Sequence, residues 1–294
     1  MDNLTHALIG LTVNNTLPKK DRVTLLTSLL ASELPDIDII YSLQGGTSYL
    51  LNHRGITHSV PAIFLFAGLL TIIARIIYPK SDSRTVFLLS SGCLSLHVLF
   101  DLFTSWGTQF LTPFSNKYFS LDYLSIIDYV IIVTALAFLI LPVICRLDRR
   151  KAALFAVLTI TCYVSFKAVT HSMLIDGLRK TYPNSVKVAV MPDTSPLKWR
   201  GIVEFNDHLI KGNINLTDNK ILSSVEQVKP INADISLYKN SPELMEVANF
   251  FRRPDYAITG DSLVVKDLYR NRQVVFPLDS GKMIVGNGII SRRR

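Results

Sequence analysis

Long apolar stretches, separated by short polar ones, fill the first 178 residues of the chain. The four longest each have an uncharged core of roughly 15 to 17 residues and reach about 20 with their flanks, which is the length that a helix needs to cross a bilayer. Two shorter apolar stretches precede them. We therefore predict four transmembrane helices at residues 60–78, 86–106, 125–145 and 152–172, behind two short helices at residues 4–17 and 23–34 that either span or re-enter the membrane.

From about residue 181 the pattern changes to short runs that alternate apolar and polar residues, which is typical of strands. Residues 242–251 are predicted to form a helix, because Ser241 suits the cap and Pro242 the first helical position. The chain is thus expected to form an all-α polytopic membrane domain at residues 1–178, followed by a small β-rich α+β soluble domain at residues 179–294. The expected strands are residues 185–191, 199–205, 208–216, 262–269, 273–278 and 282–285.

The distribution of basic residues adds an orientation. The chain has 294 residues and a net charge of +8, and nine of the thirteen Lys and Arg residues before residue 179 lie in the loops at residues 19–22, 80–84 and 146–151. Because basic loops favour the cytoplasm, we expect these loops inside and the β-rich domain outside the cytoplasmic (inner) membrane. The positive charge is spread through the loops, so nucleic acid is not an expected partner.

The cysteines and the first residues give no sign of a secreted, disulfide-linked protein. Cys93, Cys145 and Cys162 all lie in apolar stretches, where we expect small buried hydrophobic residues and not disulfides or zinc ligands. The start lacks a basic segment followed by an apolar segment and a cleavage site. We therefore expect it to be retained as structure.

Ionisable residues inside the apolar stretches give the strongest functional signal. A charged side chain in hydrocarbon costs at least about 2.5 to 3.5 kcal/mol on insertion scales. Even so, His97 and Asp101 lie in the second long stretch, one helical turn apart on one face, and Asp2 and His6 repeat this spacing in the first helix. In the predicted topology, further histidines and acids fall at the same outer level of the membrane, namely Asp36, Asp38, His53, His58 and Asp128.

Imidazole and carboxylate groups together point to a metal site. They are the usual ligands of zinc, and carboxylates also suit manganese or magnesium. Because the candidate ligands are too many for one ion, we expect two or three divalent ions, with zinc favoured. Paired ions can hold an attacking hydroxide and stabilise a leaving oxygen during phosphoester cleavage. Arg54, between His53 and His58, suits a bidentate grip on a phosphate.

Other interpretations of the same residues remain open. His97 alone could form an interhelical hydrogen bond, and with Asp101 it could form an ion pair or a proton relay. Asp36 and Asp38 could be turn or cap residues. The whole cluster could serve a divalent-cation or proton transporter, or belong to a non-catalytic membrane assembly protein. A site at one face of the membrane and spans without an inverted repeat argue against transport.

Four segments resemble the YdjM-type family of bacterial membrane-bound, predicted metal-dependent hydrolases. They are residues 1–10, 34–38, 53–59 and 97–101, in the family's order, and the β-rich part is similar at residues 196–200 and 264–269. That family is distantly similar to the zinc-dependent phospholipase C and single-strand nuclease superfamily, which implies a phospholipase C-like helical core. The implied metal ligands are His6, Asp38, His53, His58, His97 and Asp101, with Asp36, Arg54 and Asp128 as further candidates. The soluble relatives also use a processed N-terminal residue as a ligand, for which this chain shows no processing signal.

The leading hypothesis is an integral membrane metallohydrolase that cleaves a phosphoester. A site at headgroup depth meets lipid before soluble substrates, so we expect a phospholipid or a lipid-linked phosphate as substrate. Asp36 or Asp38 would act as the base and Arg54 would stabilise the developing charge. The predicted metal ligands are His6, Asp38, His53, His58, His97, Asp101 and Asp128.

Overall fold

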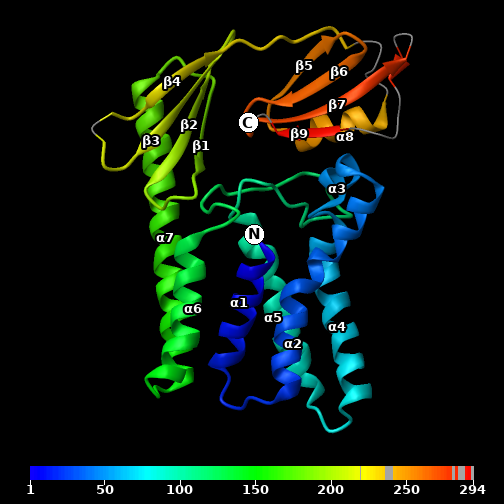
Figure 1. Ribbon diagram of the computed structural model, residues 1–294, viewed down its shortest axis with the longest axis vertical. Coiled ribbons are helices and arrows are strands. Elements are labelled where there is room, and N and C mark those ends of the chain that lie inside the picture. Colours follow the sequence, from blue (N-terminus) through cyan, green and yellow to red (C-terminus); the bar gives the residue numbers. More distant parts are fainter. Residues whose placement is uncertain (219, 236–240, 280–281, 284–288, 293–294) are drawn as a thin grey trace.

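The computed structural model describes residues 1–218, 220–235, 241–279, 282–283 and 289–292 of the chain. Helices form the first part, and two antiparallel sheets stand at one end of it (Figure 1). The helices of the first part are α1 (Asn3–Thr16), α2 (Arg22–Glu33), the 3-10 helix η1 (Leu34–Gln44), α3 (Gly46–Asn52), the 3-10 helix η2 (Ile56–His58), α4 (Val60–Ile77), α5 (Ser83–Leu102), α6 (Tyr129–Ile144) and α7 (Arg149–Thr181).

Three described helices, α4, α5 and α7, are long and apolar enough to cross a membrane. The fourth predicted span, residues 125–145, forms the shorter apolar helix α6, whose 16 residues extend about 24 Å at 1.5 Å per residue. It is shorter than expected because Asp128 caps it and residues 125–127 belong to the preceding loop. Helix α7 is longer than expected, and its last turns leave the bundle to carry the first sheet (Figure 1).

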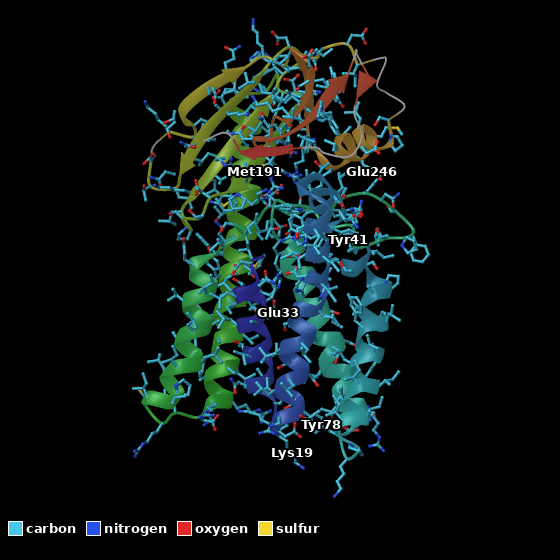
Figure 2. All side chains as sticks on the ribbon, turned by 45° about the vertical axis from the view of Figure 1, so that its right-hand side comes forward. Lys19, Glu33, Tyr41, Tyr78, Met191 and Glu246 are labelled. Carbon is cyan, nitrogen blue, oxygen red and sulfur yellow. The ribbon has the colours of Figure 1, made fainter. Side chains whose placement is uncertain are left out.

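The three basic loops lie together at the end of the bundle opposite the sheets (Figure 1). Lys19 and Tyr78 mark this end in Figure 2, whereas Tyr41 lies toward the sheets. The helices therefore run alternately toward and away from the sheets, as the charge pattern requires. Which side of the membrane each end faces stays a prediction.

Each sheet buries one face against a helix. The first sheet has the order β1-β2-β3-β4 and packs on the end of α7, where Leu178 contacts Trp199 and Val203. The second sheet packs on α8 (Pro242–Phe250) through Phe250 and Val265. The strands are β1 (Lys187–Pro192), β2 (Lys198–Glu204), β3 (Leu209–Asn215), β4 (Ser223–Val228), β5 (Pro254–Thr259), β6 (Ser262–Asp267), β7 (Arg272–Asp279), β8 (Lys282–Met283) and β9 (Ile289–Arg292).

The sequence analysis missed three of these strands, β4, β5 and β9. Strand β4 lies at an edge and is largely exposed, so its residues lack the alternation that marks a half-buried strand. The strand predicted at residues 282–285 is present as β8 over its first two residues, and residues 284–285 lie outside the described part of the chain.

The loop between α5 and α6 joins the helical part to the second sheet. The Arg252 guanidinium forms an ion pair with Asp122 at 2.7 Å and donates a hydrogen bond to the Ser120 hydroxyl. Arg270 reaches the same loop at Gly107, where an added Cβ would lie 3.4 Å from its Nη2 atom. Gly107 has a φ of 97°, which a residue with a side chain rarely adopts, so the loop fits only a glycine there.

The prediction of three buried cysteines is correct only for Cys93. Cys145 and Cys162 are exposed on the surface of the helical part. An apolar helix in a bilayer has both a packed and a lipid-facing side, and an apolar run does not show on which side a residue lies.

Helices α1 and α2 approach each other closely at Gly10, where an added Cβ would lie 2.3 Å from Ser32 Oγ and 2.8 Å from the Ser28 carbonyl oxygen. We expect Gly10→Ala to lower the free energy of unfolding by about 1 to 3 kcal/mol, because the backbone oxygen cannot move aside. Gly68→Ala is the matched control, since nothing lies within 4 Å of its added Cβ. Thermal unfolding of the two variants in detergent checks this, and equal midpoints would contradict it.

Candidate metal centre

Four elements bring histidines and carboxylates together at the end of the bundle that faces the sheets. Helix α1 supplies His6, η1 supplies Asp36 and Asp38, and α5 supplies the pair His97 and Asp101. The segment from α3 to η2 supplies His53, Arg54 and His58. All eight side chains are buried, so the cluster lies inside the protein and not on its surface.

The first group consists of Asp36, His58, His97 and Asp101, whose ligand atoms all lie within 4.8 Å of one another. Nε2 of His58 is 3.1 Å from Nε2 of His97, 3.3 Å from Asp36 Oδ1 and 3.2 Å from Asp101 Oδ2. Nε2 of His97 is 3.6 Å from each of the same two carboxylate oxygens. Ligand atoms around a tetrahedral zinc ion with bonds of 2.0–2.1 Å lie about 3.3 Å apart, so the spacing suits a four-coordinate ion.

The second group consists of Asp36, Asp38 and His53, again with ligand atoms within 4.8 Å of one another. Nδ1 of His53 lies 2.8 Å from Asp38 Oδ1. Asp36 belongs to both groups, so its carboxylate lies between them. A shared carboxylate is suited to join two neighbouring metal ions.

Hydrogen bonds outside the two groups fix the orientation of the ligand side chains. Nδ1 of His97 lies 2.6 Å from the Ser32 carbonyl oxygen, so it donates a proton there and leaves Nε2 free to bind a metal. Asp38 Oδ2 accepts hydrogen bonds from the Arg54 backbone N–H at 2.9 Å and from the Thr57 hydroxyl at 3.0 Å. Such outer contacts are the usual support of a metal ligand.

The charges of the cluster favour a bound cation. Burial alone would lower the pKa of His58, but the carboxylates of Asp101, Asp36 and Asp38 that face it raise the pKa to about 10. Burial alone would raise the pKa of Asp36, but the imidazoles of His58 and His97 hold it well below its usual range. Asp101 Oδ2 and His6 Nε2 are buried and, although each lies within 3.4 Å of another member of the cluster, neither makes a hydrogen bond of good geometry with the described residues. The donor set therefore fits a divalent metal ion.

His6 and Asp128, both predicted ligands, have different positions. Nε2 of His6 lies 3.4 Å from Asp101 Oδ1 and its ring stacks on His97 at 3.7 Å, so His6 lies beside the first group. Asp128 belongs to neither group. Its carboxylate instead caps α6 at the Val130 N–H and accepts a hydrogen bond from the Tyr163 hydroxyl at 3.1 Å.

Arg54 does not face an open site, contrary to the expectation of a phosphate contact. Its Nη2 atom lies 2.8 Å from Asp101 Oδ1, and its Nη1 atom donates to the Thr104 hydroxyl at 2.7 Å. The residue is 1 % exposed, so this guanidinium is committed to holding Asp101. The amino group of Met1 also contacts Asp101. Asp2 and His6 have the same spacing as His97 and Asp101, but Asp2 caps α1 by accepting a hydrogen bond from the Thr5 N–H.

The sequence analysis did not identify the residues that contact the candidate ligands from outside the two groups. Thr57 lies between the two histidines of residues 53–59, so its position was visible there but its contact with Asp38 was not. Trp106 gave no signal. Its ring meets the edge of His53 at 5.4 Å and stacks with the Arg272 guanidinium at 3.7 Å, so it joins the metal centre to the second sheet.

Comparisons with known proteins agree with the helical part of this description. A family model described as YdjM inner membrane protein matches residues 1–174. The chain is also similar to the uncharacterized protein YfhP of Bacillus subtilis (strain 168), with 32% identity over 146 residues, which cover 47% of this chain and 45% of that protein. The chain thus spans less than half the length of this relative. No solved structure matches the chain.

If the first group binds a metal ion, substitution of one of its ligands should remove the metal and leave the fold intact. We expect His97→Ala to lose most of the metal that co-purifies with the chain, because Nε2 of His97 faces the other three ligands of the first group. His208→Ala is the matched control, since His208 pairs with Asp207 in the turn before β3. Elemental analysis of both purified variants checks this. Equal metal content in the two would contradict the assignment.

Proposed function

The chain belongs to the YdjM inner membrane protein family, and we propose that it is a membrane-bound, metal-dependent hydrolase that cleaves phosphoester bonds. The observation that carries this proposal is the pair of buried His/Asp groups that share Asp36. Two adjacent metal positions with a common carboxylate suit the in-line displacement of a phosphoester. Zinc fits the first group, which has two histidines and two aspartates. In the second group, which has two aspartates and one histidine, manganese or magnesium fits as well as zinc does.

The residues of the chain divide the work of such a site. When bound, the divalent ions supply positive charge that polarises a phosphoryl oxygen and activates a water molecule. Asp38 has three hydrogen-bond partners, His53, Arg54 and Thr57, so it is held as a ligand and is not free to take a proton. Asp36 has one weak contact outside the cluster, at 3.4 Å from the Asn3 amide. We therefore assign to Asp36 the role of the carboxylate that both metal positions share, and to Arg54 a positioning role through Asp101.

The surface beside the site favours a lipid substrate. In η1, the buried carboxylates of Asp36 and Asp38 alternate with isoleucines at residues 37, 39 and 40 that are more than half exposed. A row of exposed isoleucines is costly in water and suits contact with acyl chains. The same short helix therefore presents ligands to the metal centre and an apolar face to the membrane. A phospholipid or a lipid-linked phosphate reaches the site along this face.

Activity of the full chain in lipid nanodiscs tests the function. We expect hydrolysis of phospholipid phosphoesters that a chelator abolishes and added zinc or manganese restores. Asp101→Asn should lower the rate at least about a hundredfold, because Asp101 is both a ligand and the partner of Arg54. Asp176→Asn, an exposed position on α7, is the matched control. Metal flux into proteoliposomes without phosphoester turnover would overturn the proposal in favour of a transporter, and neither activity would favour an assembly role.

Substitution in η1 tests the route of the substrate. We expect the double variant Ile39→Gln and Ile40→Gln to lower turnover of a bilayer lipid several-fold and to leave turnover of a water-soluble phosphodiester unchanged, because both side chains point away from the cluster and are 60 % and 61 % exposed. Leu147→Gln serves as the control, because Leu147 is 55 % exposed in the loop between α6 and α7, and this loop lies at the opposite end of the bundle (Figure 1). An equal loss on both substrates would show that η1 only supports the fold.

A further inference from the structure

A cavity of about 460 Å³ lies between the helical part and the two sheets. Met191, which marks this junction in Figure 2, lies in its wall. The loop after α5 closes it on one side, and the strands close it on the other. Its lining includes residues 105–106, 124–127 and 191–194, together with Arg200 of β2, Arg270 of the turn between β6 and β7, and Arg272 of β7.

The cavity carries an excess of positive charge. Its lining holds three arginines and one acid, Asp193, whose carboxylate accepts hydrogen bonds from the N–H and the hydroxyl of Thr194 in its own loop. In the described part of the chain, no carboxylate oxygen lies within 4.0 Å of the Arg200 guanidinium. The nearest acid to Arg270 is Asp267 at 3.7 Å, longer than a hydrogen bond. Among the described residues, Arg200 thus has no neighbouring acid, and Arg270 has a loose ion pair with Asp267.

Several donors in the lining lack a partner. Ser105 Oγ, Trp106 Nε1 and Arg270 Nε are buried and make no hydrogen bond with the described residues. Buried donors are almost always satisfied, and leaving one without a partner costs about 1 to 3 kcal/mol. An anion with several acceptor oxygens would satisfy a hydroxyl, an indole N–H and a guanidinium N–H at once.

Trp106 connects this cavity to the metal centre. One side of the indole contacts Arg272 at 3.7 Å, and the Arg54 guanidinium lies 5.8 Å from the same ring. His53 of the second metal group meets the ring at 5.4 Å. A group held in the cavity is therefore one aromatic ring away from the metal ligands.

We propose that this cavity is a phosphate-binding site that receives a phosphate-bearing part of the substrate beside the metal centre. Guanidinium groups bind phosphate through paired N–H donors, and more than one of them suits a dianionic phosphate. Arg200 and Arg272 hold the phosphate, and Arg270 offers its Nε–H to it while its Nη1 atom donates to the Phe250 carbonyl oxygen. That the phosphate belongs to the substrate rests on the proposed function, whereas the binding of phosphate needs no metal.

Binding of inorganic phosphate to the full chain, stripped of metal by a chelator and held in a maltoside detergent, tests the site. We expect Arg200→Gln to weaken phosphate binding about tenfold or more, since it removes a charge-assisted hydrogen bond. The double variant with Arg272→Gln should weaken it further. Arg179→Gln removes the same charge from an exposed position on α7 and should bind phosphate like the unchanged chain. Calorimetry or equilibrium dialysis measures the affinity.

The outcomes separate this site from the metal centre. His97→Ala should lose metal and turnover and keep its affinity for phosphate. Loss of phosphate binding in His97→Ala, with binding retained in Arg200→Gln, would place the phosphate on the metal centre and overturn the inference. Unchanged affinity in the arginine double variant would overturn it as well. Phosphate binding that depends on Arg200 in a chain without phosphoester turnover would leave the cavity assigned and remove the proposed function.

Competition shows which molecule supplies the phosphate. Phosphatidic acid in nanodiscs should displace inorganic phosphate if the cavity holds a lipid headgroup. Displacement by glycerol 3-phosphate with no effect of phosphatidic acid would assign a soluble phosphate ester. Either result supports a cavity that receives the phosphate of a larger molecule, whereas displacement by neither would overturn that part of the proposal.

Discussion

Three carboxylates buried at one end of a helical bundle set the constraint on which this structure depends. Asp36, Asp38 and Asp101 are almost entirely removed from solvent, and burial of a charge is costly unless opposite charges and hydrogen bonds surround it. The protein supplies Arg54 to Asp101 and the histidines to all three. What remains is a set of imidazole nitrogens and carboxylate oxygens spaced as ligands around a cation. The positions of α1, η1, η2 and α5 are tied together by this one requirement.

The segment between α2 and α4 shows how the sequence meets that requirement. Proline at the start of η1 ends the regular helix, and the tighter turn that follows places Asp36 and Asp38 inside and the isoleucines outside. Arg54 follows with a φ of 65°, a rare conformation for a residue with a side chain. In this conformation its backbone N–H reaches Asp38 while its guanidinium reaches Asp101, so one residue ties the two metal groups to each other.

Apolar runs and the spacing of a few ionisable residues were enough to predict the helices and most of the cluster. The alternating direction of the spans brings six of the predicted residues to one level of the membrane, and the positions of the basic loops indicate this direction. The six are Asp36, Asp38, His53, His58, His97 and Asp101. The roles of Arg54 and Asp128 did not follow in the same way. An arginine between two histidines can hold a ligand or a substrate, and an acid before an apolar helix can cap it or bind a metal. The residues that each side chain contacts in the folded protein determine its role. Here Arg54 contacts Thr104 and Asp128 contacts Tyr163, and no sequence pattern indicates either contact.

The two parts of the chain meet at Trp106, and this contact gives each part a separate task. The candidate metal ligands lie within residues 1–174, the range matched by the family, whereas Arg200, Arg270 and Arg272 lie beyond it. The ion pair between Arg252 and Asp122 joins the β-rich part to the loop after α5, and Arg270 lies close to the same loop at Gly107. Such fixed contacts would not be needed if the β-rich part only linked the helical part to another molecule. They are needed if the arginines of the sheets must stand at a fixed distance from a reacting phosphorus, because positioning error is costly in rate. In this proposal the helical part supplies the chemistry, and the β-rich part selects what is cleaved.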